Sequence, residues 1–205
     1  KQNALDAVNI LPFVERAAAY LMQFAPVTQQ ERWEENSGYS PSTLAAVITG
    51  LICASELVLA HDAPELADFY AVFADWIESN LEAWTVTDDG ILLPEVRRHY
   101  MRIRPPGPGD RFYNPAAGEG RIELANRGPG EKSNFDAREI IDHGFLELVR
   151  YGIRSPHDPL IVDSLKVVDA VLKVNTPHGP CWRRYNHDGY GQKHDGGPSE
   201  GWGQG

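Results

Sequence analysis

Three carboxylates, an arginine and a tryptophan are gathered in one short segment between two apolar stretches. The residues of this segment that could do chemistry are Glu31, Arg32, Trp33, Glu34 and Glu35. A carboxylic acid beside an indole ring can be desolvated, which raises its pKa and suits a general acid. A neighbouring carboxylate can accept hydrogen bonds from sugar hydroxyls. On residue types alone, a solvated charged loop with a structural tryptophan is the more common explanation of such a run.

A second candidate segment spans residues 182–191, with the sequence WRRYNHDGYG. Aromatic rings stack on sugar faces, and arginine and aspartate side chains make directional hydrogen bonds to hydroxyl groups. The segment therefore fits a carbohydrate site. The alternative is a glycine-rich turn region whose aromatic side chains only pack.

Two histidines and two aspartates near the end of the sequence suggest a metal site, but their spacing does not support one. They are His187, Asp188, His194 and Asp195. The spacing matches no helical two-histidine motif, and glycines separate the two pairs. The sequence also lacks a phosphate loop, a dinucleotide fingerprint and a GxSxG motif. We therefore expect no metal and no cofactor.

The composition narrows the class of protein. The 205 residues are 42% hydrophobic and 23% charged, which is typical of a folded globular protein. A net charge of -10 repels phosphate backbones, so we expect no nucleic-acid partner. The two cysteines, Cys53 and Cys181, exclude a disulfide framework and a thiolate zinc site. We expect Cys53 to be buried by packing.

The most apolar stretch of the chain is residues 43–60, which include Thr49, Ser55 and Glu56. A buried helix of a soluble protein explains these polar residues better than a membrane span. No signal peptide is visible. We therefore expect no membrane partner.

Apolar residues at helical spacing predict five helices, stacked as hairpins. They cover residues 11–25, 41–61, 64–84, 136–151 and 159–174. Ser40 is expected to cap the second helix, with Pro41 at its first helical position. The third helix is expected to bury one face, made of Leu66, Phe69, Phe73, Trp76, Ile77 and Leu81.

The middle of the chain has no helical periodicity. Residues 86–104 indicate short strands or extended segments. Residues 104–133 are rich in proline and glycine and indicate a long loop. A loop of this length in a compact domain is functional or mobile.

Four segments together resemble glycoside hydrolase family fifteen, and most closely its bacterial glucoamylase and glucodextranase branch. They are residues 30–43, 136–150, 176–180 and 182–191, and their order and spacing match the family. The resemblance covers nearly the whole chain. It implies an all-α fold, a partial (α/α)6 toroid of helical hairpins with long loops, within which residues 86–104 form a short β-like excursion.

The resemblance also implies roles in the first candidate segment. Glu34 matches the general acid of an exo-acting enzyme that removes glucose from the non-reducing ends of α-glucans and inverts the anomeric centre. Trp33 and the backbone carbonyl of Arg32 would line the first sugar subsite. Glu35 would bind the sugar on the leaving-group side.

In the second candidate segment, Arg184 and Asp188 match a substrate-binding Arg-Tyr-x-x-Asp pattern of the family. His187 stands where fungal members carry an acidic residue. The match therefore implies substrate binding by Arg184 more directly than by Asp188.

An inverting glycosidase needs a second carboxylate, about 6.5–9.5 Å from the acid, to activate water. Glu34 and Glu35 cannot be this pair, because adjacent residues do not face each other across a sugar. In the family the general base lies further downstream, so we expect it beyond residue 205. We interpret residues 1–205 as a single partial domain, the central part of a catalytic domain whose N-terminal and C-terminal helices are missing. Alone, this chain is expected to be inactive.

Two alternatives stay open, a non-catalytic carbohydrate-binding relative and a structural helical scaffold. The expected partners are an α-glucan oligosaccharide or polysaccharide and the remainder of the same catalytic domain. The linkage is open among α-1,4, α-1,6 and trehalose. The resemblance leans towards an extracellular or periplasmic location.

Overall fold

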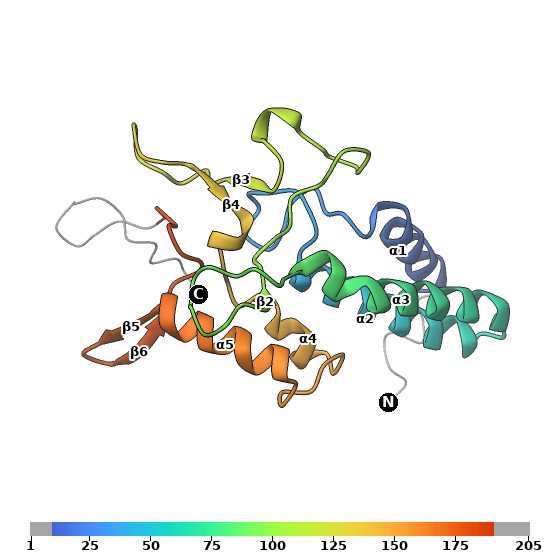
Figure 1. Cartoon of the computed structure of the whole chain (residues 1–205). Coiled ribbons are helices and arrows are strands. Elements are labelled where there is room, and N and C mark those ends of the chain that lie inside the picture. Colours follow the sequence, from blue (N-terminus) through green and yellow to red (C-terminus); the bar gives the residue numbers. More distant parts are fainter. Residues whose placement is uncertain (1–9, 191–205) are drawn as a thin grey trace.

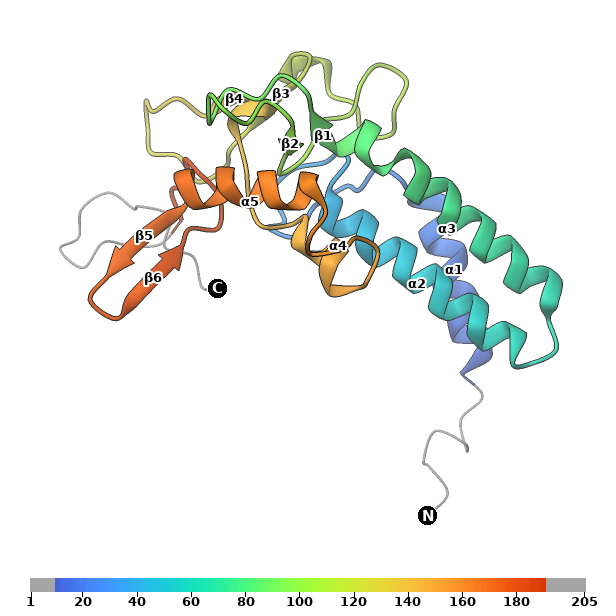
Figure 2. The same cartoon turned by 60° about the horizontal axis from the view of Figure 1, so that its bottom comes forward.

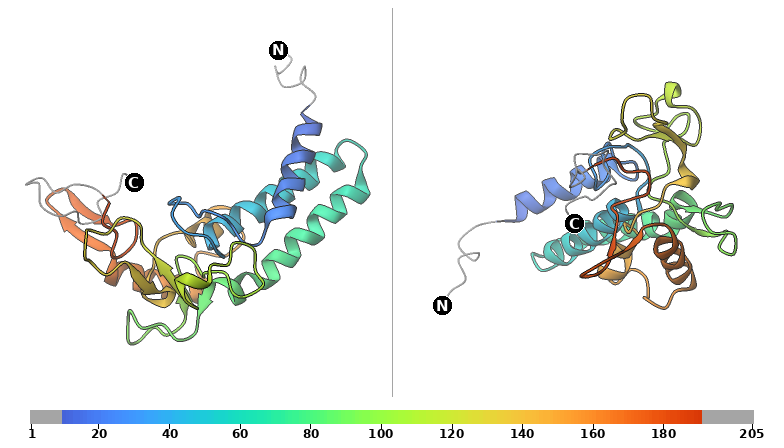
Figure 3. Two further views of the ribbon diagram at one scale, coloured as in Figure 1. Left: turned by 90° about the horizontal axis from the view of Figure 1, so that it is seen from above. Right: turned by 90° about the vertical axis from the view of Figure 1, so that its left-hand side faces the viewer.

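The computed structural model describes residues 10–190. Three helices lie together at one end of the molecule, and loops, short strands and two further helices lie at the other (Figure 1). Seen from above, the described elements form an open crescent (Figure 3, left).

The helical end consists of α1 (Leu11–Phe24), α2 (Pro41–Leu59) and α3 (Pro64–Thr85). α2 and α3 form an antiparallel hairpin and run side by side (Figure 2). α1 packs against α2. The three predicted N-terminal helices are thus confirmed to within one or two residues at each end.

The start of α2 differs in detail from its prediction. Pro41 is at the first helical position and Ser40 has the extended backbone of an N-cap residue. The Ser40 hydroxyl, however, makes no capping bond to a backbone N–H. It instead shares a hydrogen bond of 2.9 Å with the hydroxyl of Ser42.

α2 supplies much of the apolar core, but it is not covered on every side. Leu44, Leu51 and Val58 are fully buried. Ile52 is exposed, and so is Cys53, so the expectation that this cysteine is buried was wrong. Among the described residues, α2 is the one helix long and apolar enough to cross a membrane, and its packing against α1, α3 and α4 fits a core helix equally well.

The buried face of α3 is rotated from the predicted one. It consists of Ala67, Tyr70, Ala74, Ile77, Leu81 and Thr85. These positions repeat every three or four residues and form a narrow seam, where the small alanines allow α2 to approach closely. Of the residues expected on this face, Ile77 and Leu81 are buried, and Leu66 and Phe73 are partly buried against the core. Phe69 and Trp76 were also expected there and are exposed instead.

Three antiparallel two-stranded ladders occupy the other end of the molecule. They pair β1 (Val86–Thr87) with β2 (His99–Tyr100), β3 (Arg121–Glu123) with β4 (Asn134–Asp136), and β5 (Lys173–Thr176) with β6 (Gly179–Trp182). The expected short strands at residues 86–104 are confirmed. The long loop carries one 3-10 turn, η2 (Pro115–Ala117), and strand β3.

The predicted helix at residues 136–151 is wrong for most of its length. Only a 3-10 turn, η3 (Ala137–Glu139), and a short helix, α4 (Leu146–Arg150), are helical. Between them the chain is extended at Ile140, and Asp142 pairs with Tyr185 of a distant segment. This long-range pairing overrides the local apolar pattern, which cannot by itself distinguish a buried extended run from a helix.

The last helix, α5 (Pro159–Val171), confirms its prediction. Asp158 caps it, because its carboxylate accepts the backbone N–H of Leu160 at 2.8 Å. Several of its apolar positions are buried and Leu165 is partly buried. The buried ones include Leu160, Ile161, Val168 and the C-cap residue Leu172.

Two apolar clusters follow from this arrangement. The larger one joins α1–α5. The smaller one lies under the loops and contains Met101, Ile103, Ile122, Leu124, Phe135, Ala137, Ile140 and Tyr185, with Trp33 packed against it. The first candidate segment therefore packs against this second cluster through Trp33.

Candidate active site

Residues 28–39, which we call the acid loop, form a closed turn between α1 and α2. Its two ends are joined because Thr28 and Gly38 exchange backbone hydrogen bonds of 2.9 Å. Further in, the N–H of Glu31 donates to the carbonyl of Asn36 at 3.1 Å. Gly38 has a φ of 148°, and a Cβ there would lie 2.2 Å from the carbonyl oxygen of Arg104. Only glycine therefore fits this crossing.

Glu34 lies at the tip of the acid loop. Its N–H donates to the carbonyl of Glu31 at 2.8 Å, and its φ is 59°, in the left-handed region. Such a backbone costs about 1–3 kcal/mol in a non-glycine residue and persists only where the surroundings hold it. The Glu34 side chain is exposed. Glu34 is therefore not the desolvated acid beside an indole ring that the residue types suggested.

A desolvated carboxyl beside Trp33 is instead provided by Asp142, which is 2% exposed. The indole Nε1–H donates to Asp142 Oδ2 at 2.9 Å, and the N–H of Gly144 donates to Oδ1 at 2.8 Å. Burial raises the pKa of Asp142, although these hydrogen bonds and Arg102 work against the rise. Asp142 was not among the expected site residues. It fixes the orientation of the Trp33 ring.

Glu35 is the most heavily bonded carboxylate of the acid loop. The Tyr185 hydroxyl lies 2.8 Å and 2.6 Å from its two oxygens. Asn126 Nδ2 donates to Oε1 at 2.7 Å, and Arg102 Nη2 donates to Oε2 at 3.1 Å. Burial and the bond to Glu35 raise the pKa of Tyr185 far above its ordinary value. The hydroxyl therefore stays a donor to Glu35.

Arg102 lies beneath the acid loop and is 1% exposed. Its Nη2 donates to Glu31 Oε1 at 2.6 Å, and its guanidinium lies 3.9 Å from the centre of the Tyr185 ring. Burial alone lowers the pKa of Arg102, but the Glu31 carboxylate raises it above its ordinary value, so the guanidinium stays charged. Sequence reasoning missed Arg102. The available signal was weak: Arg102 lies between the apolar residues Met101 and Ile103, but Arg97, Arg98 and Arg104 are close by in the sequence.

Arg184 and Asp188 form a bidentate ion pair. Arg184 Nε and Nη2 donate to Asp188 at 2.6 and 2.9 Å, and the Asp188 side chain is fully buried. The backbone N–H of Tyr190 also donates to Asp188 at 2.9 Å. With its oxygens so engaged, Asp188 orients Arg184. The Arg184 guanidinium in turn lies 5.1 Å from the Trp33 ring centre and 3.6 Å from a Glu35 oxygen.

The structure thus brings four of the six expected site residues into one connected cluster. They are Trp33, Glu35, Arg184 and Asp188. Arg32 and Glu34 lie on the exposed side of the same loop, and the Arg32 guanidinium is 4.8 Å from the centre of the Trp33 ring. Tyr185 of the second candidate segment, Asn126 and Arg102 complete the cluster. Asn126 and Arg102 were not expected from the sequence.

The long loop at residues 104–133 lies against the acid loop. Besides the bond from Asn126 to Glu35, Asn36 Nδ2 donates to the carbonyl of Glu123 at 2.8 Å. A Cβ at Gly189 would lie 1.6 Å from the Asn126 carbonyl oxygen, so the chain passes there only as glycine. Two hollows of about 510 and 200 Å³ lie along this contact, and Glu35 and Asn36 line both.

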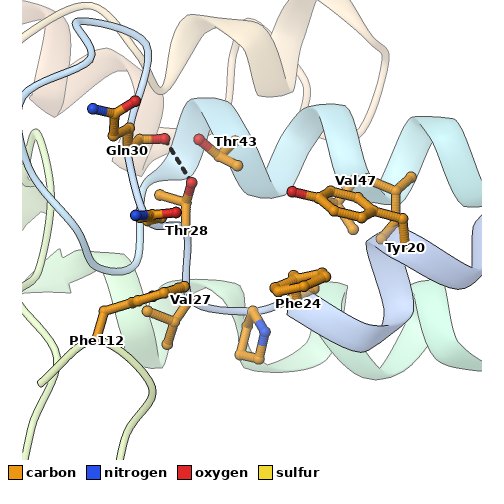
Figure 4. A pocket seen from close by; sticks show the side chains of 12 residues that line it. Tyr20, Phe24, Val27, Thr28, Gln30, Thr43, Val47 and Phe112 are labelled. Carbon is orange, nitrogen blue, oxygen red and sulfur yellow. Dashed lines mark hydrogen bonds between the residues drawn. The ribbon is translucent and has the colours of Figure 1, made fainter. Parts of the chain in front are cut away.

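A further cavity of about 300 Å³ lies between the end of α1 and the start of α2 (Figure 4). Its lining mixes aromatic rings with hydroxyl and amide groups. The labelled lining residues are Tyr20, Phe24, Val27, Thr28, Gln30, Thr43, Val47 and Phe112. It borders the acid loop through Thr28, whose hydroxyl donates to the Gln30 carbonyl at 2.6 Å.

The histidines considered in the sequence lie apart from this cluster or outside the described residues. His187 stacks on Phe135 with ring centres 4.6 Å apart, and burial lowers its pKa. His194 and Asp195 lie outside the described residues. Within residues 10–190, no group of three or more His, Cys, Asp or Glu is placed to hold a metal ion.

Comparison with known proteins identifies relatives of this chain. The family model for glycosyl hydrolases family 15 matches residues 2–200. A glucoamylase from Clostridium sp. (strain G0005) is 42% identical over 180 residues, which are 87% of this chain and 24% of that protein. The chain thus spans about a quarter of the length of this curated relative.

A solved structure of a bacterial glucoamylase complexed with acarbose is similar in fold and sequence. The TM-score is 0.80 and the identity 37%, over 94% of this chain and 27% of that chain. The fold class expected from the sequence is thereby confirmed, an all-α fold that forms part of an (α/α)6 toroid.

Proposed function

Because the chain belongs to glycosyl hydrolases family 15, we propose that the full-length protein is an exo-acting, inverting α-glucan hydrolase. It would release β-glucose from the non-reducing ends of α-glucan oligosaccharides or polysaccharides. The acarbose bound by the similar bacterial glucoamylase supports an oligosaccharide ligand. Residues 1–205 would be the central part of its catalytic domain.

The observation that carries this proposal is the contrast between two adjacent glutamates. Glu35 is held by Tyr185, Asn126 and Arg102, whereas the Glu34 side chain is exposed at the loop tip. A carboxyl that must reach a glycosidic oxygen needs to be accessible. A carboxylate that binds sugar hydroxyls needs to be fixed. The two environments suit these two tasks.

In this mechanism Glu34 is the general acid and protonates the leaving glycosidic oxygen. Glu35 accepts hydrogen bonds from the sugar on the leaving-group side. The Arg32 carbonyl and the Trp33 ring line the first subsite, and Arg184, held by Asp188, donates hydrogen bonds to its sugar hydroxyls.

The second carboxylate needed for inversion lies about 6.5–9.5 Å from the acid, with room for a water between them. Glu35 cannot fill this role, because it is adjacent to Glu34 and the two side chains cannot face each other across a sugar with a water between them. We place the general base in a segment that follows residue 205. The 205 residues on their own would then be inactive.

The test is to follow, by proton NMR, the anomer that the full-length protein first releases from maltose, isomaltose and trehalose. Initial β-glucose supports the proposal, and the substrate that yields it identifies the linkage. Initial α-glucose means retention and overturns it. Binding of these sugars without any release of glucose would instead support the non-catalytic carbohydrate-binding relative.

A further inference from the structure

Arg102 bonds to both sides of the acid-loop tip. Its Nη2 lies 2.6 Å from Glu31 Oε1 and 3.1 Å from Glu35 Oε2. Glu31 precedes Glu34 by three residues and Glu35 follows it directly. One guanidinium, from a residue just after β2 and about seventy residues further along the chain, therefore holds the chain before and after Glu34.

The two anchored residues leave little freedom for the backbone between them. Glu31 Oε2 accepts the N–H of Trp33 at 2.9 Å, and the Glu31 carbonyl accepts the N–H of Glu34 at 2.8 Å. Glu34 has a left-handed φ of 59°, which persists only where neighbouring contacts impose it. The ion pairs of Arg102 are contacts of this kind.

The ion pairs are buried, so they differ from surface pairs that contribute little. The side chains of Arg102 and Glu31 are 0% exposed and that of Glu35 is 7% exposed. The Tyr185 ring lies 3.9 Å below the guanidinium, and the backbone N–H of Arg102 donates to the carbonyl of Ile140 at 3.2 Å. Arg102 is therefore itself fixed from below.

We propose that Arg102 is a positioning residue, which holds Glu31 and Glu35 and thereby fixes the backbone of Glu34 in the orientation for proton donation. The role of Glu34 in this inference rests on the proposed function. The clamp on the acid loop does not, because it follows from the contacts of Arg102 alone.

If Arg102 had only a structural role, its replacement would lower the stability of the protein and nothing else. If Arg102 positions Glu34, its replacement also lowers kcat and speeds amide exchange in the acid loop of the folded protein. Arg102→Met in the full-length protein should lower kcat about 100-fold, since a misplaced catalytic group costs about this much. KM should rise by a smaller factor, because Glu35 loses one partner but keeps Tyr185 and Asn126. Amide hydrogen exchange at Glu31 and Glu34 should become about tenfold faster. Arg102→Lys keeps the charge but loses the stacking of the planar group, so it should restore kcat in part.

Two further variants keep the test decisive. Arg98→Met, four residues before Arg102, removes the exposed ion pair with Asp88 and should change neither kcat nor exchange. Glu31→Gln removes one half of the clamp while keeping its shape. If Arg102→Met does not fold, Glu31→Gln should still lower kcat about tenfold and speed exchange at Glu34.

Wild-type kcat and exchange in folded Arg102→Met, or in Glu31→Gln, would overturn the inference. If the wild-type protein releases no glucose, the proposed function fails, and the exchange of the acid-loop amides still decides the clamp. Faster exchange of these amides in the variants then supports the clamp by Arg102, and unchanged exchange contradicts it.

Discussion

The α2–α3 hairpin and the acid loop are held by different kinds of interaction. The hairpin buries apolar side chains such as Leu51 and Ile77 between two helices that follow each other in sequence. The acid loop is held by polar side chains that come from 67 and 150 residues further along the chain, Arg102 and Tyr185. The comparison teaches that the hairpin supplies stability, while the buried polar cluster supplies a defined orientation.

The largest expected effect on stability is that of Leu51→Ala, in the hairpin. Leu51 is 0% exposed, so truncation leaves a cavity and should lower the free energy of unfolding by about 2–5 kcal/mol. Urea denaturation of the full-length protein measures this. KM for the best substrate should stay unchanged. A changed KM would break the comparison, because the hairpin would then also position the site.

The second effect is that of Tyr185→Phe, in the polar cluster. The variant keeps the ring under Arg102 but removes the hydroxyl that donates to Glu35. Loss of a hydrogen bond to a charged group should reduce stability by about 1.5–3 kcal/mol.

Tyr185→Phe should also raise KM for a disaccharide, because Glu35 is less well fixed. Steady-state kinetics beside urea denaturation separate the two effects. A loss of stability with unchanged KM would show that this hydroxyl serves folding alone.

The smallest effect is expected for Phe69→Ala, on the outer surface of α3. Phe69 is 55% exposed, so its truncation should change the free energy of unfolding by less than about 0.5 kcal/mol. Urea denaturation measures this change, and Leu51→Ala measured under the same conditions gives the reference for a large loss. A loss close to that of Leu51→Ala would show that another segment buries this face in the full-length protein.

The hairpin could be predicted from the sequence because its signals are local. Apolar residues at helical spacing and the prolines at the first positions define α2 and α3. The buried side of α3 was predicted only in part, since Ile77 and Leu81 are buried as expected, whereas Ala67 and Ala74 are buried in place of Phe69 and Trp76. Close helix packing selected small side chains over large ones.

The candidate site could also be predicted only in part. The acid loop and the segment of Arg184 carry recognisable residue types. Arg102 and Asn126 come from segments without helical periodicity, and Asp142 comes from a segment whose apolar spacing indicated a helix. Their roles depend on contacts between distant parts of the chain, and the extended backbone near Asp142 was wrongly predicted as helix for this reason.

The central claim is that Glu34 donates the proton to the leaving group, and one pair of rates tests it most directly. The full-length Glu34→Gln variant is compared with wild type on maltose and on α-glucosyl fluoride. Fluoride leaves with little need for protonation, whereas a sugar alkoxide depends on a general acid.

We expect hydrolysis of maltose to fall at least about 100-fold, hydrolysis of the fluoride to fall less than about tenfold, and stability to stay within about 0.5 kcal/mol, since the Glu34 side chain is exposed. Equal losses on both substrates, or full activity on maltose, would contradict the claim.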